Sequence, residues 1–177
     1  MNQDVKEARG RSRLRLAAIA LAAGSLLVSS APVGAGGHQN LHGSFTETPA
    51  GAGRGYDIAG SAKLTVGPDW SAAKVNVVGL DPVKAYGSHL HNGTCAAGGG
   101  GHYQDAEGGS TVPPNELWLS SSSAANGPLA PNPGGVAHGK GSATWAARLD
   151  STTQTNARSI IVHEPGSGAR IACADLT

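Results

Sequence analysis

Apolar and polar residues alternate in short segments along much of this chain. Residues 61–66 place three apolar side chains on one face, and residues 73–77 alternate in the same way. Alternation of this length is typical of a β-strand with one buried face. Between the two segments, Gly67-Pro68-Asp69 has the composition of a turn. We therefore predict two strands joined by a turn.

Three further segments have the same character: residues 40–48, 142–149 and 157–164. No stretch of twelve residues shows the capped 3.6-residue apolar stripe that predicts a helix. Residues 92–114 are rich in glycine and residues 120–135 in Ser, Ala, Pro and Asn, so we predict two long loops there. Many short strands with Gly and Pro turns indicate an all-β antiparallel sandwich or barrel. Long loops in such a small domain are usually functional or mobile.

The composition supports this fold class. Glycine accounts for 27 of 177 residues and charged residues for only 14%, which argues against a helical bundle or a coiled coil. The glycines are scattered rather than periodic, which excludes collagen. A formal net charge of +1 gives no reason to expect nucleic-acid binding.

The charge is concentrated at the start of the chain, where five basic residues lie within the first fifteen. An apolar run follows over residues 16–28, and a small-residue site ends at Ala35. These three parts predict a secretory signal peptide over residues 1–35 and a mature domain over residues 36–177. The run is shorter than the ~20 residues that span a bilayer. We expect an exported protein, periplasmic or extracellular, with no membrane span in its mature form; the alternative is a disordered basic tail.

The chain has two cysteines, Cys95 and Cys173, and both lie in the predicted mature domain. An even number of cysteines in an exported protein predicts a disulfide. The alternative is a pair of buried free thiols.

Four of the seven histidines form a pattern that suits a metal. His89 and His91 are two positions apart in a strand, so both imidazoles point to one face. His102 follows beyond a run of glycines, and His163 ends the apolar residues 159–162. A His-x-His pair alone is a weak signal, but four such residues favour a site for Cu, Zn, Ni or Fe.

Two segments containing these histidines resemble copper/zinc superoxide dismutases. The order, the residue types and the second cysteine agree over roughly residues 40–177. The resemblance implies a Greek-key, immunoglobulin-like β-barrel of eight strands. It also implies that copper, alternating between Cu(II) and Cu(I), converts superoxide to oxygen and hydrogen peroxide. The matching residues are Gly79-Leu-Asp-Pro-Val-Lys-Ala-Tyr-Gly-Ser-His-Leu-His91, Gly93-Thr-Cys95, Gly101-His102, Ser159-Ile-Ile-Val-His-Glu164 and Gly168-Ala-Arg-Ile-Ala-Cys173.

The resemblance further implies roles for single residues. Arg170 would stand at the mouth of the site and attract the superoxide anion, which a fixed guanidinium does well. The residues alone favour another interpretation, an exposed Arg170 paired with a carboxylate such as Asp175. Cys95 and Cys173 would form the intrachain disulfide of the family. The copper ligands would be His89, His91, His102 and His163.

The zinc half of the family's site is not evident. In the family, the ligand that matches His102 bridges to zinc, and further ligands follow. Here no histidine lies between His102 and His138, and residues 113–118 occupy that place. We therefore expect copper without zinc, as in the copper-only members. The alternative is a weak oxygen site made by Asp105 and Glu107.

Without zinc, the second ring nitrogen of His102 needs another partner, because ligating histidines normally donate their other N–H. A carboxylate can accept this hydrogen bond. Glu116 is the candidate partner for His102; the alternative is that Glu116 is a solvated loop residue. The loop between His163 and Arg170 is also shorter than in the family, which would leave the copper site more open.

Cleavage after Ala35 would expose Gly36-Gly37-His38, whose nitrogens can surround Cu(II) in a square plane. Two other functions remain: a copper-scavenging domain without catalysis, and a purely structural sandwich. The four histidines together with Arg170 disfavour the structural sandwich. The sequence does not fix the oligomeric state.

Overall fold

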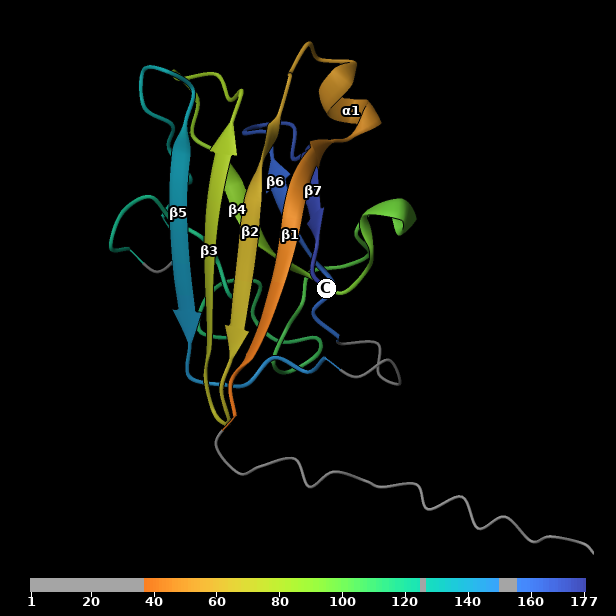
Figure 1. Ribbon diagram of the computed structural model, residues 1–177, viewed down its shortest axis with the longest axis vertical. Coiled ribbons are helices and arrows are strands. Elements are labelled where there is room, and N and C mark those ends of the chain that lie inside the picture. The colour runs from red at the N-terminus through yellow and green to blue at the C-terminus, as the bar shows by residue number, and fades with distance from the viewer. Residues whose placement is uncertain (1–36, 125–126, 150–155) are drawn as a thin grey trace, which may run out of the picture. The chain divides into compact units, whose positions relative to one another are not determined.

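The computed structural model describes residues 37–124, 127–149 and 156–177 (Figure 1). The predicted signal peptide and Gly36 lie outside the described residues. The described chain contains one antiparallel sheet in the order β4-β6-β7-β1-β2-β3-β5. The all-β fold is therefore confirmed. Its strands are β1 (Gln39–Glu47), β2 (Ala59–Val66), β3 (Ser71–Val78), β4 (Gly87–His91), β5 (Ala137–Ala143), β6 (Ser159–His163) and β7 (Arg170–Asp175).

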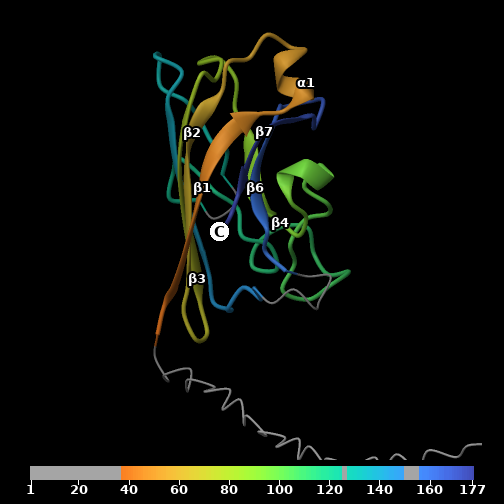
Figure 2. The same cartoon turned by 45° about the vertical axis from the view of Figure 1, so that its right-hand side comes forward.

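The sheet curls so that its two ends approach each other. Figure 2 shows β1, β2 and β3 facing β4, β6 and β7 across the interior. Residues 117–120 connect the two edge strands. Leu119 N donates to Ser88 O of β4 at 2.8 Å, and Ser120 exchanges two backbone hydrogen bonds of 3.0 Å with Lys140 of β5. The resemblance implies eight strands, and the described residues contain seven; the closing segment (residues 117–120) bridges the two edges of the sheet.

A glycine makes the closing segment possible. A Cβ atom on Gly141 would lie 2.0 Å from the carbonyl oxygen of Trp118, which is far inside van der Waals contact. Only glycine therefore lets β5 approach the closing segment this closely.

The interior is filled by the inward positions of the alternating strands. The residues predicted to share a face of β2 are buried at Ala62, Leu64 and Val66, and Val75 and Val77 of β3 are buried as well. Leu90 of β4 also belongs to this core. The predictions of strands at residues 61–66 and 73–77 are confirmed.

The prediction of a strand over residues 142–149 is largely wrong. Strand β5 ends at Ala143. Beyond it, the hydroxyl of Ser71 donates to Trp145 O at 2.9 Å and accepts from Ala147 N at 2.8 Å. A side chain thus satisfies the backbone groups that a neighbouring strand would otherwise bond, and the chain leaves the sheet.

Helical structure in the described residues is limited to two short pieces. The α-helix α1 (Pro49–Ala52) begins after Thr48, whose hydroxyl accepts from Gly51 N, and a 3-10 turn spans Cys95–Ala97. Within these ranges no helix has the length and apolar character needed to cross a membrane.

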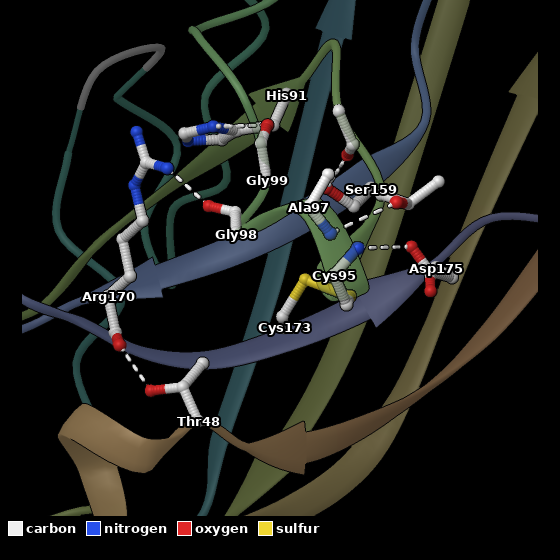
Figure 3. The surroundings of a disulfide bond; sticks show 12 residues. Thr48, His91, Cys95, Ala97, Gly98, Gly99, Ser159, Arg170, Cys173 and Asp175 are labelled. Atoms are coloured by element: carbon white, nitrogen blue, oxygen red, sulfur yellow. Dashed lines mark hydrogen bonds between the residues drawn. A yellow bond between two sulfur atoms is a disulfide. The ribbon is translucent and has the colours of Figure 1, made fainter.

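The disulfide between Cys95 and Cys173 is present, with a Cα–Cα distance of 5.7 Å. It joins the start of the glycine-rich loop to the middle of β7 (Figure 3). Asp175 Oδ1 accepts a hydrogen bond from Cys95 N at 2.7 Å beside it. The alternative of two free thiols is wrong, and the loop start is fixed to the barrel at two points.

Candidate metal centre

Two adjacent strands and one loop bring four histidines together. His89 and His91 flank the core residue Leu90 on β4, so both imidazoles face away from the interior. Strand β6 pairs with β4 and carries His163 at its end. His102 is held beside β4 because the next residue, Tyr103, donates its N–H to Leu90 O at 2.9 Å.

The ligand nitrogens of His89, His91, His102 and His163 all lie within 4.8 Å of one another. We call these residues the four-histidine group. Nε2 of His91 is 3.1 Å from Nε2 of His163. Four potential metal ligands thus converge on one small volume, as the sequence pattern predicted for their positions.

Hydrogen bonds decide which nitrogen of each ring is free. Nδ1 of His91 lies 3.2 Å from Gly99 O, Nδ1 of His163 lies 3.1 Å from Gly168 O, and Nδ1 of His102 lies 3.1 Å from both Glu116 oxygens. Carbonyl and carboxylate oxygens only accept hydrogen bonds, so Nδ1 donates in each case. The lone pair of each neutral ring is then on Nε2, where it is available to a metal.

His89 differs from the other three histidines, because its Nδ1 makes no hydrogen bond within the described chain. Its side chain is 3% exposed, and its Nδ1 is buried without a hydrogen-bond partner among the described residues. An unpaired buried polar atom is costly in a protein interior. A metal ion bonded to this nitrogen would satisfy it, so the four-histidine group fits a metal of the imidazole-preferring kind.

The electrostatics of the group keep the imidazoles of His89, His91 and His163 neutral. Burial, followed by the neighbouring His102, His91 and His163, lowers the pKa of His89 to about 2. Burial, followed by His163, His102 and Arg170, lowers the pKa of His91 to about 3. Burial also lowers the pKa of His163. At neutral pH these lone pairs are therefore free of protons and ready to bind a cation.

Glu116 is placed against His102, as we expected from the sequence. It is 2% exposed and accepts hydrogen bonds from three side chains. Besides His102, Gln104 Nε2 donates at 3.1 Å and Trp118 Nε1 donates at 2.8 Å. The alternative of a solvated loop carboxylate is not what the structure shows.

Gln104 and Trp118 were not identified from the sequence. Trp118 belongs to the closing segment, and its ring lies 4.8 Å from the ring of His89. The signal available was the spacing: Glu116 and Trp118 share a face in an extended segment, and a buried indole N–H needs an acceptor.

Replacing Glu116 with glutamine is expected to weaken metal binding, tested here with copper, about 10- to 100-fold, the usual effect of losing such a partner. The glutamine amide group would direct N–H groups at the N–H donors of His102, Gln104 and Trp118, from which the Glu116 oxygens accept. The measurement is the copper dissociation constant, obtained by competition with a chelator. Glu107→Gln, at an exposed carboxylate in the same loop, is the matched control. Equal affinities of the two variants would contradict the role of Glu116.

Arg170 is fixed by the glycine-rich loop and not by a carboxylate. Its Nη1 donates to Gly98 O and its Nη2 to Gly100 O, the latter at 2.7 Å. Gly99 between them accepts from His91 (Figure 3). One loop therefore positions both the guanidinium and an imidazole of the four-histidine group. The alternative, a pairing of Arg170 with Asp175, is not what the structure shows: Arg170 donates to the loop carbonyls, and Asp175 accepts from Cys95 N.

This loop conformation requires glycine. Gly98, Gly99 and Gly100 have φ angles of 71°, 85° and 63°, which side-chain-bearing residues rarely adopt. A Cβ on Gly99 would also lie 2.0 Å from Ile161 Cδ1. The run of glycines in the sequence therefore turns three successive carbonyl groups toward Arg170 and His91.

The short loop after His163 is held by Glu164, a residue not identified from the sequence. Glu164 accepts from Arg54 Nε at 2.9 Å, Lys84 Nζ at 3.0 Å, Tyr56 Oη at 2.9 Å and Ser167 Oγ at 2.9 Å. Hydrogen bonds from Lys84, Ser167 and Tyr56 lower the pKa of Glu164 to about 2. The loop that supplies the Gly168 carbonyl to His163 is thus tied to the barrel.

The remaining potential ligands lie elsewhere. Among the described residues, the second close group is Cys95, Cys173 and Asp175, whose sulfurs are joined in the disulfide. Asp105 lies 3.8 Å from Arg148, and His138 is exposed on β5 opposite Asn76. His38 contacts the ring of Trp70.

Comparison with known proteins supports the fold. No family model matches this chain, and no curated protein is significantly similar in sequence. The crystal structure of a mutant of a SOD-like protein from Bacillus subtilis is 18% identical and has a TM-score of 0.50. The match covers 76% of this chain and 95% of that one. A double mutant of a SOD-like protein from the same organism matches at 18% identity with a TM-score of 0.48 and the same coverage. The chain therefore has a SOD-like β-barrel fold, with four histidines able to hold a metal ion.

Proposed function

We propose that this protein is an exported superoxide dismutase that uses copper and no zinc. The observation that carries the proposal is the convergence of four free imidazole nitrogens beside an arginine fixed by backbone carbonyls. Imidazole ligands suit copper in both of its oxidation states. The disulfide supports export, because thiols in the cytosol are normally kept reduced.

The ligands would be Nδ1 of His89 and Nε2 of His91, His102 and His163. Bound copper supplies one-electron exchange between its +2 and +1 states. The protein positions the substrate: the guanidinium of Arg170 carries a permanent charge and attracts the small superoxide anion. Gly98 and Gly100 hold this charge in place, so little reorganisation is needed when the anion arrives.

Glu116 supports a site without zinc. In copper/zinc superoxide dismutases the residue resembling His102 shares its second nitrogen with zinc. Here that nitrogen, Nδ1, is engaged by a buried carboxylate that Gln104 and Trp118 also bond. Glu116 thus orients the ring of His102 and keeps a proton on its Nδ1, which leaves Nε2 for copper.

The deciding experiment is to load the purified protein with copper alone and measure superoxide dismutation together with its copper and zinc content. Turnover at one copper per chain without zinc is the expected result. Bound copper without turnover would favour a copper-scavenging domain on the same fold. Stoichiometric zinc would contradict the copper-only assignment.

Replacing Arg170 with alanine is expected to lower kcat/KM at least about tenfold, the lower end of electrostatic steering. The dependence of the rate on ionic strength should weaken at the same time. Copper affinity, measured by chelator competition, should change little, because Arg170 is not a ligand. Arg170→Lys keeps the charge and should retain part of the rate. Equal activity of Arg170→Ala and the unaltered protein would overturn this role.

A further inference from the structure

Three lysines lie side by side on the outside of the barrel. Lys63 of β2 is directly opposite Lys74 of β3, and Lys74 is directly opposite Lys140 of β5. His42 of β1 extends the row, because it is opposite Lys63. We call these four residues the basic row; the strands that carry it lie side by side at the front of Figure 1.

The basic row points into solvent. In β2 the neighbours of Lys63 are the buried Ala62 and Leu64, and in β3 the neighbours of Lys74 are the buried Ala73 and Val75. Since successive strand residues face opposite sides, the lysines project outward. Neighbouring strands are about 4.8 Å apart, so the lysines repeat a cationic group at about this interval across the three strands β2, β3 and β5.

This arrangement is unfavourable for the fold itself. Like charges directly opposite each other on neighbouring strands destabilise a sheet. The ion pairs formed by the described residues involve none of these three lysines. The predicted mature domain has eight Lys and Arg against ten Asp and Glu, so the row is a local positive feature on a slightly acidic domain. An anionic ligand would offset the repulsion.

The surroundings of the row indicate the chemistry of that ligand. On one side the row is flanked by a parallel row of polar residues, and on the other by a row with two hydroxyl groups and an amide. No acidic residue occurs in either flanking row. Their members, by strand register, are Ser44, Ser61, Asn76 and His138 on one side and Asn40, Thr65, Ala72 and Ser142 on the other.

Surface depressions on this face are lined by the same kinds of side chain as the row and its flanks. One is lined by Lys74, Lys140, Ser122 and Ser123, and a neighbouring one by Lys74, Lys140, Ser120 and His138. Lysine charges and hydroxyl groups therefore line the same surface depressions.

We propose that the basic row binds a linear acidic polysaccharide. Lysine ammonium groups would pair with successive acidic groups, while the flanking hydroxyl and amide groups would hydrogen-bond the sugar hydroxyls. A membrane surface is disfavoured, because the exposed large apolar residues in the described ranges, Val83 and Val112, lie outside these strands. A nucleic acid is disfavoured because the row and its flanks offer neither arginine nor the large ring of a Phe, Tyr or Trp for stacking a base.

The test uses the copper-loaded protein and alginate, a linear polymer of uronic acids, as the probe. We expect binding that weakens as salt rises. The variant Lys63→Ser, Lys74→Ser, Lys140→Ser should bind alginate at least tenfold more weakly. Its melting temperature should rise, because three facing like charges are removed. Copper content and dismutation should be unchanged, because these residues are outside the metal centre.

The matched control is Val83→Glu, Ser110→Glu, Thr111→Glu, which changes the net charge by the same amount at exposed positions outside the sheet. It should bind alginate nearly as well as the unaltered protein. Failure of the unaltered protein to bind alginate, or equal weakening in both variants, would overturn the proposal. So would binding to phosphatidylglycerol vesicles or to single-stranded DNA in preference to alginate. Each of these results is independent of whether the protein dismutates superoxide.

Discussion

The metal-free protein is expected to lose about 5 kcal/mol of its free energy of unfolding between pH 6.5 and pH 4.5. His89 and His91 have folded-state pKa values of about 2 and about 3, against 6.5 in the unfolded chain. Between these values the unfolded chain binds more protons than the folded protein. Stability is therefore fully present above pH 6.5 and falls as the pH falls, by about 1.4 kcal/mol per pH unit for each histidine.

Because small domains are stable by only about 5–15 kcal/mol, this loss should bring the metal-free protein close to acid unfolding within that window. Urea unfolding at a series of pH values measures it. The variant His89→Asn, His91→Asn removes these two titrating groups and should make the slope shallower, whatever its stability at pH 7; the lowered pKa of His163 leaves a remaining slope. Ser44→Asn, at an exposed residue that does not titrate, is the control and should leave the slope unchanged. A slope that is the same in both variants would show that burial of the imidazoles is not the cause.

Reducing the disulfide is expected to lower the free energy of unfolding of the metal-free protein by about 4–5 kcal/mol. The bond closes a loop with a sequence separation of 78, and this is the loss of chain entropy that such a loop removes from the unfolded state. Copper affinity should fall as well, because the bond anchors the loop that supplies the Gly99 carbonyl to His91.

Comparing the oxidised and reduced protein in urea isolates the bond itself, since no side chain is replaced. Cys95→Ala, Cys173→Ala provides a second form that cannot reoxidise. Identical unfolding midpoints for the oxidised and reduced protein would contradict the prediction. A lower midpoint with unchanged copper affinity would limit the role of the bond to stability and leave the loop independently ordered.

The strands with one buried face were the most predictable part of the fold. In β2 and β3 the apolar residues alternate strictly, and their inward positions are buried. Residues 142–149 have a similar composition, but Ser71 takes over the backbone groups of Trp145 and Ala147. That outcome depends on a side chain more than seventy residues away, which local periodicity does not contain.

The candidate site also has a part that the sequence predicted and a part that it did not. The four histidines could be identified because two lie at strand spacing and two lie in segments that resemble a family. The supporting contacts were harder to foresee. Gly99 and Gly168 act through backbone carbonyls, which any residue possesses. Glycine permits the loop conformation, but the residue type does not say which group each carbonyl will bond. Trp118 acts through a segment whose position is set only when the barrel closes.

That closure also protects the ends of the sheet. A strand at the edge of a sheet exposes unpaired N–H and C=O groups and invites pairing with a second molecule. Here residues 117–120 cover both β4 and β5, and they follow Glu116 directly along the chain. Displacing Glu116 from His102 would therefore loosen the segment that shields two strand edges. Damage to the metal centre and a tendency of the protein to aggregate would then arise together.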